Sequence, residues 1–146
     1  MRFTNFGRKN YSYPINTCIY FCNSRAVFLN VGGNDITSRC CTDTIFRDIV
    51  NIAEVLYANG VEKVFIASIV QRGKFKPWTG LDSDQFRMIR RSINKKLKSK
   101  YGECFVEVDK RLIFPRHYDS DLVHPGDKEG GMNVLMHAVM KCFKKM

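Results

Sequence analysis

Residues 26–37 read Ala-Val-Phe-Leu-Asn-Val-Gly-Gly-Asn-Asp-Ile-Thr, and this stretch decides the fold. Its first half is a short apolar run rich in β-branched and aromatic residues, which is typical of a strand buried on both faces of a parallel sheet. Gly32 and Gly33 end the run, because glycine allows backbone angles and close approaches that a side chain blocks. Asn34 and Asp35 therefore lie at the carboxyl end of a buried strand, where open α/β sheets bind their ligands.

Apolar runs and amphipathic stretches alternate along the rest of the chain. Besides the run at 27–31, residues 64–70 and 104–108 have the composition of buried strands. A stretch with helical spacing follows each of the three runs. This order predicts a three-layer α/β fold with a parallel sheet whose strand ends meet at one edge. The apolar positions with helical spacing are Ile45, Ile49, Ile52, Ala53 and Leu56, then Phe86, Ile89, Ile93 and Leu97, and finally Met132, Leu135, Val139 and Cys142.

The start of the chain is the part whose structure is least readable from the sequence. Residues 15–21 alternate between apolar and polar side chains, which hints at a further strand, whereas the residues before Pro14 show no period. We therefore expect a poorly defined segment over residues 1–25 and one α/β domain over residues 26–146. A chain of 146 residues is long enough to bury a core of its own.

The composition narrows the classes of protein that fit. With 45% hydrophobic and 26% charged residues, the chain is typical of a soluble globular protein, and no apolar run approaches the ~20 residues of a membrane span. The absence of a signal-peptide core favours the cytoplasm. The six cysteines show neither a CxxC pair nor a zinc-ligand spacing, so we expect reduced thiols and no metal. No glycine-rich phosphate loop opens a helix, and we expect no cofactor.

A second polar block, Asp121-Leu122-Val123-His124, precedes the last predicted helix. At this spacing the carboxylate can reach the Nδ1 proton of the imidazole and fix its tautomer, which frees the other ring nitrogen to act as a general base. Pro125 disfavours a helical conformation at His124, so we expect the histidine in a loop. At the other strand end, the side-chain N–H of Asn34 beside a glycine turn suits an oxyanion hole.

The two blocks, in this order, resemble those of the SGNH (GDSL-like) hydrolase superfamily, a group of lipase and esterase relatives built on a flavodoxin-like sandwich. Residues 32–35 match the family's G-x-N-D block, whose asparagine helps to form the oxyanion hole. Asp121 and His124 match its D-x-x-H block, which supplies the catalytic aspartate and histidine. The resemblance covers residues 26–143. It implies that Asp121 and His124 are catalytic, that Asn34 is the oxyanion donor, and that Gly32, Gly33 and Asp35 support them.

The family's nucleophile, the serine of a G-D-S block on the first strand, has no counterpart here. The single Gly-Asp pair is Gly126-Asp127, and a lysine follows it. Residues 1–25 are too short for the strands, helix and turn that precede the G-x-N-D block in the family. The chain therefore resembles such a domain truncated at its N-terminus, and we expect it to be inactive by itself. Ser38, Cys40 and Cys41 are the alternative nucleophiles.

The net charge of +10 suggests a second function class. The basic excess is concentrated in residues 87–100, where Arg87, Arg90, Arg91 and Lys95 can form either a solvated helix face or a surface that binds nucleic acid or another polyanion. Two interpretations thus stay open. One is an esterase-like domain with a small ester or acylated substrate. The other is a basic α/β binding module, like the esterase-like domains that accompany some mobile-element proteins.

Overall fold

A computed structural model describes residues 18–22 and 25–144 of the chain, and the side chains of residues 25–144. The strands in this part form one sheet in the order β1 (Cys18–Cys22), β2 (Ala26–Asn30), β3 (Lys63–Ala67) and β4 (Phe105–Val106). β2, β3 and β4 are parallel neighbours, which confirms the prediction for the three apolar runs. Expectations for residues 1–17, 23–24 and 145–146 lie outside the described residues.

A further strand, β1, runs antiparallel to β2, with Cys18 opposite Asn30. The sequence contains the physical reason. Only residues 23–25 separate the two strands, whereas a parallel neighbour needs a crossover of a dozen residues or more. β1 thereby pairs with the edge of β2 that faces away from β3.

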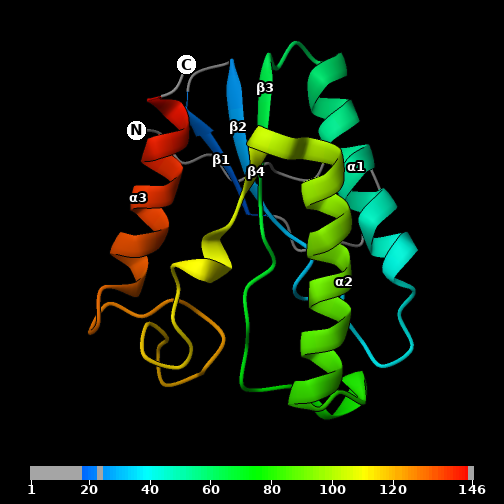
Figure 1. Ribbon diagram of the computed structural model, residues 1–146, viewed down its shortest axis with the longest axis vertical. Helices are drawn as coiled ribbons and strands as arrows, with labels where there is room; N and C mark the ends of the chain where they lie inside the picture. Colours follow the sequence, from blue (N-terminus) through cyan, green and yellow to red (C-terminus); the bar gives the residue numbers. More distant parts are fainter. Residues whose placement is uncertain (1–17, 23–24, 145–146) are drawn as a thin grey trace.

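In the described part of the chain, α-helices cover both faces of the sheet and make it the middle layer of a sandwich (Figure 1). α1 (Thr42–Ala58) and α2 (Ser83–Tyr101) lie on one face, and α3 (Gly131–Phe143) lies on the other. Successive residues of a strand point to opposite faces. In β2, accordingly, Leu29 packs in the core under α1 and α2, whereas Phe28 packs in the core under α3. Short 3-10 helices lie at Pro77–Thr79, Gly102–Cys104 and Val108–Lys110.

The helices run opposite to the parallel strands, so the carboxyl ends of β2, β3 and β4 meet at one edge (Figure 1). The loops that follow these strands, residues 31–41, 68–82 and 107–130, carry both polar blocks. α2 begins at the end of the second loop with a capping box, in which Asp82 and Gln85 each accept the other's backbone N–H. No helix in the described part of the chain is long and apolar enough to cross a membrane.

Candidate functional site

A cavity of about 140 Å³ opens at the carboxyl ends of β2 and β3, and residues of both polar blocks line it. Asn34 comes from the loop after β2, and His124 comes from the loop before α3. The two side chains are 90 positions apart in the sequence (124 − 34) but share one cavity. The remaining wall consists of residues 30–33, 69–72, Val108, Leu112, Val123, Pro125 and Leu135.

Asp121 and His124 form the acid–base pair that their spacing predicts. The imidazole Nδ1 lies 2.5 Å from Asp121 Oδ2, and Oδ1 accepts the backbone N–H groups of Val123 at 2.8 Å and His124 at 3.0 Å. The pKa of Asp121 is held well below its usual range, first by the hydrogen bond from the His124 backbone and then by the one from its imidazole. Because an ionised carboxylate only accepts hydrogen bonds, Nδ1 carries the proton and Nε2 stays available.

The loop that carries this pair is held by backbone hydrogen bonds. Asp119 N–H donates to the carbonyl of His124 at 2.9 Å, and Gly73 N–H, from the loop after β3, donates to the carbonyl of Leu122 at 2.8 Å. Leu122 itself has a φ of 54°, in the left-handed region that few residues other than glycine adopt. The imidazole of His124 is nevertheless 75% exposed, so solvent reaches the base.

Asn34 is positioned by a tight turn and by a cation. Gly32 has a φ of 93°, and a Cβ there would lie 3.0 Å from Ile49 Cδ1, so the turn favours glycine on both counts. A terminal nitrogen of Arg72 donates to Asn34 Oδ1 at 2.7 Å. Since arginine only donates, the amide oxygen must face it, and the N–H donors of Asn34 point elsewhere. These donors have no partner among the described residues, as an oxyanion donor requires.

Arg72 is the site residue that the sequence analysis missed. Arg72 lines the cavity, and the central carbon of its guanidinium lies 5.4 Å from the centroid of the Phe86 ring. Burial lowers the pKa of Arg72, while Tyr118 and Asp35 act in the opposite direction. A signal was available, because Arg72 follows a buried strand at its carboxyl end, as Asn34 does. The polar composition of the surrounding loop, however, predicts a solvated surface, and Arg72 was therefore not assigned to the site.

Asp35 lies behind the cavity and does not line it. Its backbone N–H donates to the carbonyl of Gly32 at 3.3 Å, which closes the turn that carries Asn34. Its Oδ2 atom is buried and has no hydrogen-bond partner in the described part of the chain. Burial and, to a lesser extent, repulsion by Asp48 raise the pKa of Asp35, whereas Arg72 lowers it. Asp35 therefore shapes the turn and does not reach the cavity.

The cavity lacks a nucleophile among the side chains that the structure describes. No serine, threonine or cysteine of residues 25–144 lines it. Ser38 hydrogen-bonds through its backbone N–H to the carbonyl of Thr79, Cys40 packs against the core, and Cys41 is the N-cap residue of α1. None of the three alternative nucleophiles is thus at the cavity. Nor does any cluster of three or more His, Cys, Asp or Glu residues that could hold a metal ion occur within the described ranges.

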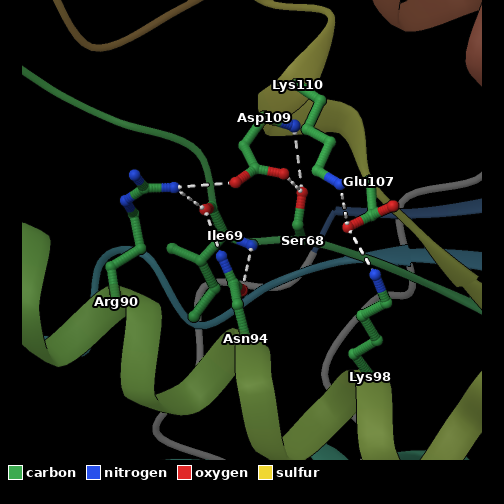
Figure 2. Close-up of polar contacts among 8 residues, drawn as sticks. All are labelled: Ser68, Ile69, Arg90, Asn94, Lys98, Glu107, Asp109 and Lys110. Carbon is green, nitrogen blue, oxygen red and sulfur yellow. Dashed lines mark hydrogen bonds and ion pairs between the residues drawn. The ribbon is translucent and has the colours of Figure 1, made fainter.

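A buried polar network holds the loop after β3 against α2 (Figure 2). Asn94 accepts the backbone N–H of Ile69 at 2.8 Å and donates to its carbonyl at 2.9 Å. Arg90 donates to the same carbonyl at 3.0 Å and to Asp109 at 3.2 Å, and Ser68 Oγ donates to Asp109 at 2.6 Å. Ile69 lines the cavity, so this network fixes the wall from which Arg72 extends three residues later.

The same network corrects the expected basic surface of α2. Arg90 is only 7% exposed and belongs to the interior, not to a polyanion-binding face. Arg87 pairs with Asp84 at 2.6 Å, Lys96 pairs with Asp43, and Lys98 pairs with Glu107 at 2.8 Å. Of the four residues expected at this surface, Arg91 and Lys95 have no ion-pair partner among residues 25–144 and lie exposed one turn apart.

The chain is similar to two solved structures of bacterial proteins. One is a GDSL-like lipase from Bacteroides thetaiotaomicron VPI-5482, with 24% identity, a TM-score of 0.66, and coverage of 81% of this chain and 61% of the other. The second, proposed to be an acylhydrolase, is from Bacteroides fragilis NCTC 9343, with 24% identity, a TM-score of 0.68, and coverage of 82% and 61%.

No protein-family model and no curated protein matches the sequence. The chain spans about 61% of the length of the two solved structures, and it matches them over about four fifths of its own length. The expected fold is therefore confirmed: over that length the chain has the α/β fold of the GDSL-like hydrolases.

Proposed function

We propose that this chain provides the acid–base and oxyanion part of an SGNH-type ester hydrolase site, and that it does not turn over esters by itself. One observation carries the proposal: His124, paired with Asp121, lines the same cavity as Asn34. In this role the ionised Asp121 orients the imidazole, Nε2 of His124 takes up a proton, and the Asn34 amide stabilises the developing oxyanion. The substrate class is a small ester or another acylated molecule.

Lack of turnover follows from the missing nucleophile. A base activates a serine or cysteine only within hydrogen-bond reach. The sequence has no Gly-Asp-Ser block, and no serine or cysteine of residues 25–144 lines the cavity. Without its nucleophile, a triad enzyme retains only roughly 10³–10⁴-fold acceleration over water from the rest of its site. This remaining acceleration is a small part of the full rate enhancement.

Two measurements test the proposal. In an assay of residues 1–146 with p-nitrophenyl butyrate, we expect at most this residual acceleration, with no difference between the wild type and His124→Ala. In a titration with the unreactive ester methyl butyrate, followed by ¹H–¹⁵N NMR, we expect the largest shifts at residues 31–34, 70–72 and 123–125. Turnover well above background that disappears in His124→Ala would overturn the inactivity. NMR shifts confined to other regions would overturn the proposal that the ester binds in this cavity.

Polyanion binding is a second candidate function, favoured by Arg91 and Lys95 on the exposed face of α2, two cations without an ion-pair partner among residues 25–144. If they contact phosphates, affinity for an oligonucleotide must fall linearly on a log–log plot against salt concentration. Replacing either residue by glutamine should reduce the slope by about 1, because each phosphate contact releases counterions. Arg87→Gln, at a cation already paired with Asp84, is the matched control and should change the slope less. Binding that does not depend on salt would refute this candidate.

A further inference from the structure

The charge at the cavity wall is unbalanced. Arg72 and His124 line the cavity, but no aspartate or glutamate of residues 25–144 does. His124 is hydrogen-bonded to the carboxylate of Asp121, whereas Arg72 forms no ion pair with any described residue and interacts only electrostatically with Asp35, which does not line the cavity. Among these residues, the single polar side chain that its guanidinium contacts is the neutral Asn34. A half-buried arginine at a cavity, without a carboxylate hydrogen-bonded to it, is suited to an anionic ligand.

Arg72 and Asn34 keep N–H donors that suit a planar anion. A guanidinium has five N–H donors, and the hydrogen bond to Asn34 Oδ1 uses one of them. The same bond leaves the Asn34 amide N–H groups beside the cation without a partner among the described residues. Aliphatic side chains also line the cavity, among them Val108, Leu112 and Leu135. The lining of the cavity thus combines a fork of donors with aliphatic side chains.

We propose that this cavity binds a short-chain aliphatic carboxylate, with its carboxylate on Arg72 and the Asn34 amide and its alkyl chain on the aliphatic side chains of the lining. The inference rests on the proposed function, since a carboxylate is the acid product that an ester hydrolase releases. A volume of about 140 Å³ suits a short chain. Carboxylate fits better than phosphate, because the wall supplies one arginine and an apolar surface where a dianion favours several cations.

The test compares three probes of similar size by ¹H–¹⁵N NMR at constant pH and ionic strength: butyrate, butyramide and methyl butyrate. We expect butyrate to bind at least tenfold more tightly than butyramide, with the largest shifts at residues 31–34 and 70–72. Arg72→Gln should remove this preference. The matched control is Arg91→Gln, which removes an exposed arginine outside the cavity and should leave the preference intact. If Arg72→Gln does not fold, Arg72→Lys replaces it and should keep the preference for the acid.

The outcomes separate this inference from the proposed function. If methyl butyrate shifts the cavity residues but butyrate binds no better than butyramide, carboxylate recognition is wrong and the ester site stands. If none of the three probes shifts these residues, both proposals are wrong. Butyrate affinity unchanged in a folded Arg72→Gln, or an equal affinity of Arg72→Lys for acid and amide, would also overturn the assignment to Arg72.

Discussion

Asn94→Leu is expected to lower the free energy of unfolding by about 2–4 kcal/mol, because it leaves a buried backbone group without a partner. Leucine has nearly the shape of asparagine, so the change removes hydrogen bonds and hardly alters the volume. The Ile69 carbonyl keeps Arg90 as a donor, but the Ile69 N–H loses its acceptor. An orphaned buried N–H alone costs about 1–3 kcal/mol.

Urea denaturation measures this effect, and the chain provides a matched control. Asn51 lies on the exposed face of α1, so Asn51→Leu exchanges the same residue types without exposing a backbone group. A surface substitution of this kind is expected to stay within about 0.5 kcal/mol of the wild type. If the two leucine variants differ by less than about 1 kcal/mol, the hydrogen bonds of Asn94 do not stabilise the loop after β3 as inferred.

The alternation of apolar runs predicted the parallel part of the sheet. An apolar run depends only on whether the strand is buried on both faces. β2, β3 and β4 each lie where a run of apolar side chains is covered on both faces. The acid–base pair was predictable for a related reason. Asp121 and His124 are three positions apart, so one turn of backbone decides whether their side chains meet. Signals that are local in the sequence could therefore be read from it.

Contacts between distant loops could not be read in this way. Arg72 and Asn34 are 38 positions apart, and their contact depends on how two loops pack after the sheet has formed. Arg90 lies between Phe86 and Ile93 at helical spacing, on the buried stripe of α2, which is the signal that could have placed it inside. Its charge instead suggested a surface position. The carboxylate that pairs with it, Asp109, comes from beyond β4.

Gly131→Ala is expected to destabilise the protein by about 2–3 kcal/mol and to displace the loop that carries the acid–base pair. Gly131 is the first residue of α3, and a Cβ there would lie 1.9 Å from the carbonyl oxygen of His117. The clash is with a backbone atom, so no side-chain rotation relieves it. That carbonyl also accepts the N–H of Gly126 at 2.9 Å, and this bond closes the loop around Asp121 and His124.

A variant at the neighbouring Gly130 separates the effect of a packing clash from the effect of backbone conformation. Gly130 has a φ of 74°, and a Cβ added there would have no heavy atom of the described residues within 4 Å. Gly130→Ala therefore adds left-handed strain of about 1 kcal/mol without a clash. Urea denaturation should find Gly131→Ala the less stable variant, and NMR should show shifts across residues 117–126 in that variant alone. Equal stabilities and equal shifts would mean that the loop adapts to the methyl group. The position of His124 would then not depend on how closely α3 approaches His117.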